Sequence, residues 1–155
     1  TTETIDAYNV LEMMLNEARS VPFEDPDGNT SGLGIEADEP ASPSDRLAFD
    51  DADDYAGYTS TPPTYPDGTS ITGYDGWTQT FTVTYLEADP SDQDLRTTTL
   101  VDEGLRLIAC ELTSPEGESY QLGCVRSAYG PAEEPAPFDA SRVTGVGINL
   151  QVGSA

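Results

Sequence analysis

The sequence predicts an α+β fold, in which an N-terminal amphipathic helix packs on an antiparallel β-sheet and a long irregular loop joins the two. Three observations predict this class. Apolar residues recur every three or four positions in residues 3–20, residues 21–76 are rich in proline, glycine and aspartate, and apolar and polar residues alternate after residue 77. At 155 residues, we predict a single domain with a helix at 1–20, a loop region at 21–76 and a sheet at 77–152.

The helix is predicted by the stretch ETIDAYNVLEMMLNEARS, residues 3–20, which has no internal glycine or proline. Its apolar stripe consists of Ile5, Tyr8, Leu11, Leu15 and Ala18. We expect the helix to end before Val21-Pro22, because proline restricts the residue that precedes it.

The loop region contains single apolar residues between turn-forming pairs such as Pro62-Pro63 and Asp75-Gly76. A loop this long is unusual in a compact domain and tends to be functional. We expect the short segments 46–49 and 55–58 to dock as small strands or a turn.

The clearest strand is WTQTFTVTYLE, residues 77–87. One face carries Trp77, Gln79, Phe81, Val83 and Tyr85, and the other carries threonines. Residues 104–113 and 119–126 read as two strands of a hairpin, because the five residues between them include a proline and a glycine. Residues 142–152 form a candidate last strand, weakened by its two glycines.

The two cysteines, Cys110 and Cys124, suit one disulfide in an exported protein or two inert thiols otherwise. If the hairpin loop is centred on Gly117, the two residues face each other across the ladder, and any even register puts them on the same side. We therefore predict a Cys110–Cys124 disulfide. The same face carries Ile108, Leu112, Tyr120 and Leu122, which the helix should cover.

The charge excludes several functions. The formal net charge is −23, and every positive side chain is an arginine, with no lysine or histidine. A triad or zinc site that uses histidine and a Schiff base that uses lysine are therefore excluded. A chain this acidic is repelled by nucleic acids and anionic membranes. We read most of the acidity as favouring solubility, and no apolar run is long enough to span a bilayer.

Two stretches are candidate calcium sites. In DPDGNTSGLGIE, Asp25, Asp27 and Asn29 match the first ligand positions of a calcium loop and Glu36 the last, but Thr30 stands where glycine is needed. In FDDADDY, the aspartates Asp50, Asp51, Asp53 and Asp54 supply oxygens without a defined spacing. Turn chemistry and solvation explain the same residues, so calcium is only a candidate cofactor here.

A catalytic carboxylate pair is not indicated, because any acidic chain can supply two carboxylates at a suitable separation. We therefore predict no enzyme activity and no catalytic residues. Aromatic residues occur along or near the loop region, and exposed aromatics can bind carbohydrate or protein. We favour the alternative that they fold back over the sheet and extend the core. They are Tyr55, Tyr58, Tyr65, Tyr74 and Trp77.

Three stretches resemble the soluble part of type IV pilin-like proteins, the minor pilins and pseudopilins. The helix closes at NEARSVPFED, and FDDADDYAGY is similar to the F-D-D-x-D-D-Y-x-G segment of minor pilins such as those of the mannose-sensitive haemagglutinin pilus. GYDGWTQTFTVTYLE and the hairpin GLRLIACELTSPEGESYQLGCVRS resemble a G-W-x-x-x-V-x-V strand and the hairpin that follows it. The resemblance covers residues 5–127, and residues 128–155 lie outside it.

The resemblance implies a structural subunit of a type IV pilus or a type II secretion pseudopilus, whose partners are other pilin or pseudopilin subunits and the assembly machinery. The chain begins at Thr1 and not at methionine, so we expect it to be a fragment or a processed product. The resemblance implies an upstream leader and an apolar helix that anchors the protein in the inner membrane. The location would be periplasmic or at the cell surface. The alternative is an extracellular calcium-dependent module that binds carbohydrate or protein.

Overall fold

The computed structural model describes residues 2–28, 32–35, 46–89, 91, 94–98 and 102–128. It has an α+β architecture, in which one helix lies on an antiparallel sheet. The helix α1 spans Thr2–Ser20, in agreement with the predicted range of 3–20. The predicted strand at 142–152 lies outside the described residues, so it stays a prediction, as does the single-domain division.

The sheet has the strand order β1-β2-β4-β5. β1 spans Thr59–Ser60, β2 Thr78–Ala88, β4 Leu105–Thr113 and β5 Ser119–Ser127, so three strands match predicted ones within one residue. A further strand, β3 (Leu95–Thr98), pairs with β2. Tyr85 of β2 is opposite both Thr98 of β3 and Arg106 of β4, so β3 borders the edge of β2 that faces away from β4.

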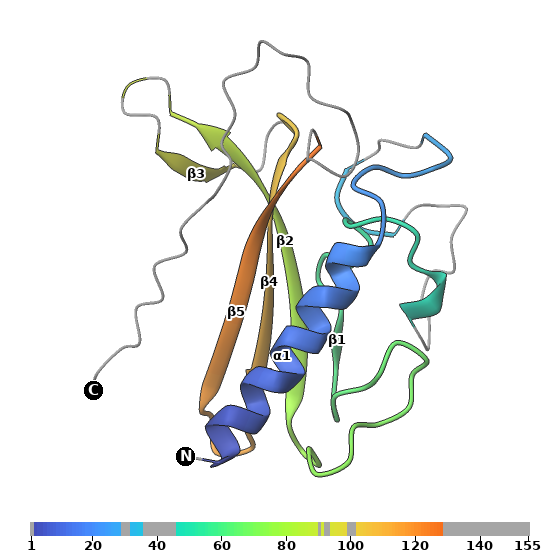
Figure 1. The fold of residues 1–155 in the computed structure, drawn as a ribbon, viewed down its shortest axis with the longest axis vertical. Coiled ribbons are helices and arrows are strands. Elements are labelled where there is room, and N and C mark those ends of the chain that lie inside the picture. The colour runs from blue at the N-terminus through green and yellow to red at the C-terminus, as the bar shows by residue number, and fades with distance from the viewer. Residues whose placement is uncertain are drawn as a thin grey trace.

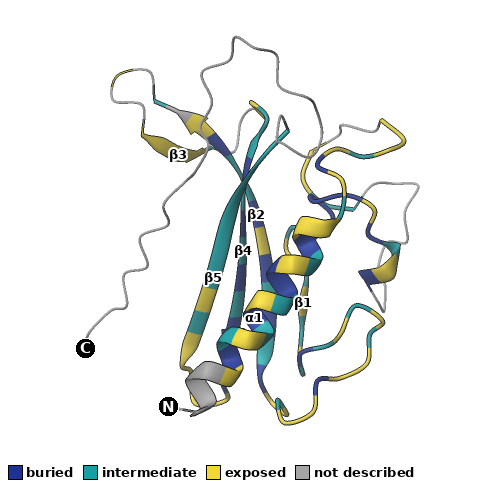
Figure 2. Ribbon diagram, viewed as in Figure 1, coloured by how far each residue is buried: buried dark blue, intermediate teal, exposed yellow. Residues whose placement is uncertain are grey.

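The helix crosses one face of the sheet, against β4 and β5 (Figure 1). Its inward side is buried and its outward side exposed (Figure 2), which follows from the predicted apolar stripe. The core contains residues from the helix, from the inward faces of β2 and β4, and from the loop region. Its buried members are Ala7, Leu11, Met14, Leu15, Ala18, Phe49, Ala52, Tyr55, Trp77, Phe81, Val83, Ile108, Cys110 and Leu112.

The loop region reaches the sheet through residues 46–60. Of the two segments expected to dock as small strands or a turn, 46–49 contains a short 3-10 helix, η1 (Arg46–Ala48), and 55–58 lies in a turn that leads into β1. Aromatic rings hold the segment in place: Tyr55 lies 4.9 Å from Phe49 and 5.1 Å from Phe81, measured between ring centroids. The segment therefore extends the core beside α1.

The register of the β4–β5 hairpin corrects one prediction. Thr113 is opposite Ser119, so the loop is centred on Glu116 and not on Gly117. Cys110 is consequently opposite Leu122 and Cys124 opposite Ile108, which puts the cysteines on the same face but in diagonal positions.

Diagonal residues lie about 7–8 Å apart, further than the roughly 4.4–6.8 Å between Cα atoms that a disulfide allows. Both thiols are free in this structure, and Cys110 is buried. Burial raises the pKa of the Cys110 thiol to about 12, which keeps it protonated and unreactive. This register disfavours the predicted Cys110–Cys124 disulfide.

Candidate functional site

The aspartates of FDDADDY form a tight turn in which side chains bind backbone amides. Asp51 Oδ1 accepts hydrogen bonds from the amides of Asp53 at 2.7 Å and Asp54 at 3.3 Å. Asp54 Oδ2 accepts from the amides of Asp50 at 2.9 Å and Asp51 at 3.3 Å. These are the local bonds by which aspartate stabilises turns. Asp51 and Asp54 therefore stabilise the conformation of this turn.

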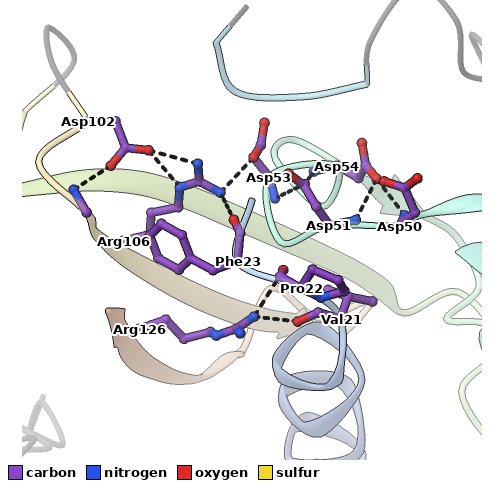
Figure 3. A network of polar contacts seen from close by, with 11 residues as sticks. Val21, Pro22, Phe23, Asp50, Asp51, Asp53, Asp54, Asp102, Arg106 and Arg126 are labelled. Atoms are coloured by element: carbon purple, nitrogen blue, oxygen red, sulfur yellow. Dashed lines mark hydrogen bonds and ion pairs between the residues drawn. The ribbon is translucent and has the colours of Figure 1, made fainter. Parts of the chain in front are cut away.

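Arg106, on the inward face of β4, anchors this turn to the sheet (Figure 3). Its guanidinium donates to Asp53 Oδ1 at 2.7 Å and to Asp102 Oδ2 at 2.8 Å. It also donates to the carbonyl of Phe23 and stacks on the Phe23 ring, with Cζ 4.3 Å from the centroid. Burial lowers the pKa of Arg106, but Asp102 and Asp53 outweigh it, so the group stays charged.

A second arginine ties the end of α1 to η1. Arg46 is only 2% exposed and donates to both carboxylate oxygens of Glu17, at 2.7 and 3.0 Å. It also donates to the hydroxyl and the carbonyl of Thr64, at 3.0 Å each. The rings of Tyr58 and Phe81 lie 4.8 and 5.2 Å from Cζ. This buried bidentate pair fixes the position of η1 against the end of α1.

An open cavity of about 500 Å³ is lined by the segment that follows α1, by the FDDADDY turn and by residues 102–104. It contains one positive side chain, Arg106, and six carboxylates. The acidic lining residues are Glu24, Asp25, Asp51, Asp53, Asp102 and Glu103. The excess of negative charge means that any ligand it holds should carry positive charge.

The first candidate calcium loop is described only in part, because Asn29 and Glu36 lie outside the described residues. Asp25 Oδ1 accepts from the amide of Asp27 at 2.6 Å, and the amide of Gly28 donates to the carbonyl of Asp25 at 3.0 Å. Gly28 has φ of +78°, which glycine adopts at little cost. The stretch therefore makes the tight turn expected of D-P-D-G.

The two candidate calcium stretches, which the sequence analysis treated separately, lie near each other. Asp25 and Asp51 both line the cavity, and the pKa of Asp50 is raised by burial and then by the negative charges of Asp54, Asp25, Asp51 and Asp27. Within the described residues, no three acidic or thiol side chains are grouped closely enough to enclose a metal ion. Calcium at either stretch stays a prediction.

One oxygen in the turn has no partner. Asp54 is 2% exposed, and its Oδ1 is buried without a hydrogen bond, whereas Oδ2 binds two amides. A buried acceptor left unpaired costs about 1–3 kcal/mol, and more when it is charged. Such a group in a native fold calls for an explanation, such as a bound water or ion.

The loop aromatics mostly join the core, as favoured from the sequence. Tyr55 and Trp77 are 1% and 7% exposed, Tyr58 and Tyr74 are half-buried, and Tyr65 is 41% exposed. Trp77 stacks on Tyr120 at 6.0 Å. These contacts leave no exposed row of rings for a sugar in the part of the loop that the structure describes.

Sequence reasoning missed the arginines and their partners, Glu17 and Asp102. One signal was available for Arg106: it shares its parity in the predicted strand with Ile108 and Cys110. A charged residue on an inward face needs a buried partner. Arg46 gave no such signal, because its segment has no periodicity.

No protein-family model, curated protein or solved structure matches the chain. In the described residues, no helix is long and apolar enough to cross a membrane. Any assignment of function therefore depends on the chain's own residues.

Proposed function

We propose that the protein is a non-enzymatic assembly subunit of a type IV pilus or a type II secretion pseudopilus. In this proposal the 155 residues are the exported head, and an apolar helix upstream of Thr1 anchors the full-length protein in the inner membrane. Other pilin or pseudopilin subunits are its partners. The proposal starts from the resemblance in three short stretches of the sequence.

The observation that supports the proposal most is that these stretches pack together at one end of α1. The helix end contributes Glu17, the FDDADDY segment contributes Tyr55, and β2 contributes Phe81. Tyr55 donates to Glu17 at 3.3 Å and packs on Phe81. Residues that resemble one family in three separate places thus form one structural unit.

The exposed side of α1 supplies a surface for neighbouring subunits. Glu12, Asn16 and Arg19 are exposed on it, while the opposite side covers the sheet. A filament built by stacking parallel helices needs one helix face committed to the head and another free for contacts. The arrangement of α1 meets that requirement.

The native gene tests the proposal. We expect the full-length product to sediment with inner membranes and to be present in surface filaments sheared from the cells. Deletion of the gene should reduce piliation or secretion, and complementation with the full-length gene should restore it. Normal piliation and secretion in the deletion strain, together with a cytoplasmic product, would contradict the proposal.

A calcium-dependent binding module is the second candidate, and the acidic cavity favours it. A cation held there would order the surrounding turns and present them to a protein or carbohydrate. A ligand that binds the isolated chain only with calcium, while the deletion strain assembles normal filaments, would favour this function over assembly.

A further inference from the structure

The strand β5 (Ser119–Ser127) forms one border of the sheet (Figure 1). Among the described residues it pairs only with β4, along one of its two edges. The strands that border the sheet on the side of β2 are short, because β1 has two residues and β3 has four. With nine residues, β5 is the longest border strand that the structure describes.

The hydrogen bonds of the hairpin show which backbone groups of β5 face outward. The amide of Ala128 donates to the carbonyl of Gly104, and hydrogen-bonded and non-bonded pairs alternate along an antiparallel ladder. The even-numbered residues of β5 therefore bond to β4, and the odd-numbered ones direct their amides and carbonyls away from it. The central three are Gln121, Gly123 and Val125, and we call their outward backbone groups the β5 edge.

The charge of β5 is unusual for this chain. β5 contains no carboxylate, although the chain has 29 acidic residues and the other long elements, α1, β2 and β4, each contain at least one. Its one charged side chain, Arg126, donates to the carbonyls of Val21 and Pro22 on the inward face. A net charge of −23 drives copies of the chain apart. Two copies can therefore meet most easily along a strand without carboxylates.

We propose that β5 pairs antiparallel with β5 of a second copy of this chain, about a two-fold axis at Gly123, so that the two sheets join into one. Gly123 is then opposite Gly123 of the second copy, and Gln121 is opposite Val125. These residues exchange backbone hydrogen bonds, because all of them face outward. The interface is isologous, and it closes as a dimer.

The side chains on the inward face also match in this register. Tyr120 is opposite Arg126 of the second copy, and Leu122 is opposite Cys124. A ring beside a guanidinium and two apolar side chains are favourable cross-strand pairs, and no like charges meet. This register also pairs all nine residues of β5, whereas any shift shortens the overlap.

The inference does not rest on the proposed function. It concerns contacts between copies of this chain through β5, whereas the exposed side of α1 is the surface proposed for other subunits. Dimerisation of the purified chain and filament assembly in cells are measured separately, so each can fail while the other holds.

Sedimentation velocity on the 155-residue chain tests the proposal. In about 0.5 M KCl the Debye length is about 4 Å, which screens the repulsion between whole copies more than charges in direct contact. We expect a reversible dimer with a Kd below about 1 mM. In hydrogen exchange followed by NMR, the amides of Gln121, Gly123 and Val125 should be slower at high chain concentration than at low, because only the dimer bonds them.

Val125→Glu replaces an apolar side chain at two places in the dimer and should weaken dimerisation about tenfold or more. Adding Gln121→Lys to it places opposite charges across the interface and should restore most of the loss. Thr82→Glu adds the same charge at an exposed position of β2, away from the β5 edge. It is the matched control and should change the Kd less than about twofold.

Two results would overturn the proposal. One is a monomer at every concentration up to about 1 mM, as expected if another segment of the chain covers the β5 edge. The other is a dimer that Val125→Glu leaves unchanged, which would place the contact elsewhere. If Val125→Glu does not fold, Gln121→Pro decides in its place. The amide of Gln121 faces away from β4, so proline there removes bonds from the dimer and none from the hairpin.

Discussion

Removing Glu17 should destabilise the fold more than removing any other carboxylate of α1. Glu17→Ala leaves the Arg46 guanidinium buried without its bidentate partner, since the Arg46 side chain is 0% exposed and that of Glu17 only 11%. Arg46 would keep its bonds to Thr64 but lose both charge-assisted bonds. An uncompensated charge in such a place is costly.

Breaking a buried pair by removing one partner costs about 3–5 kcal/mol. For a chain of 155 residues, 1 kcal/mol corresponds to about 2–4 °C in Tm, so Glu17→Ala should lower Tm by about 6–20 °C. Changing both residues together, as Glu17→Met with Arg46→Met, removes the unpaired charge and should cost less than Glu17→Ala alone.

Urea unfolding followed by the fluorescence of Trp77, the only tryptophan and a buried one, measures the change. Glu12→Ala, on the exposed face of α1, is the matched control and should stay within about 0.5 kcal/mol. A loss below about 1 kcal/mol for Glu17→Ala would refute the reasoning, because exposed pairs contribute that little.

Three further predictions concern the turn and the hairpin. Asp50 has a raised pKa in the folded chain, so its ionisation disfavours folding. Asp50→Asn should therefore stabilise the chelator-treated protein at pH 7. This gain in stability should vanish as the pH falls below 3.8, the ordinary pKa of aspartate, because the carboxyl is then protonated in both the folded and the unfolded chain. Urea unfolding at the two pH values checks this, and a gain that persists at low pH would contradict it. Cys110 and Cys124 should titrate as two thiols in denatured, unreduced protein; zero thiols would show that the β4–β5 register differs from the one described. Gly123→Ala would place Cβ 3.0 Å from the carbonyl oxygen of Ile108 and should destabilise the protein by about 1–3 kcal/mol in the same unfolding assay, whereas an unchanged midpoint would argue against that close packing.

The helix and the main strands could be predicted because periodicity alone defines them. The stripe of α1 and the alternation in β2 and β4 depend on neighbours in sequence, and the structure reproduces both with the expected faces buried. β3 could not be found this way, because LRTT is exposed almost throughout, so no buried face imposes an alternation of apolar and polar residues on it, although it pairs with β2. The predicted centre of the hairpin loop was wrong by one residue, which shifts the pairing of β4 with β5 by two, since loop composition does not determine which residue is central.

The candidate site was predictable in composition but not in arrangement. The aspartates of both stretches were identified, yet their roles in capping the turn depend on which amides they reach. Their proximity depends on Arg106 and Arg46, which fix the loop region against the sheet and the helix. Such contacts join residues 53 positions apart in the case of Asp53 and Arg106, and no local pattern encodes them.

Photo-crosslinking in native cells tests the central claim, that the protein is an assembly subunit, most directly. A photoreactive amino acid replaces Asn16, which is exposed on α1, in the full-length gene product, and Leu11, which is fully buried, is the matched control position. The account predicts adducts from position 16 with another pilin or pseudopilin subunit, and none from position 11. Surface-filament fractions without such adducts, from cells in which the protein is folded and exported, would contradict it.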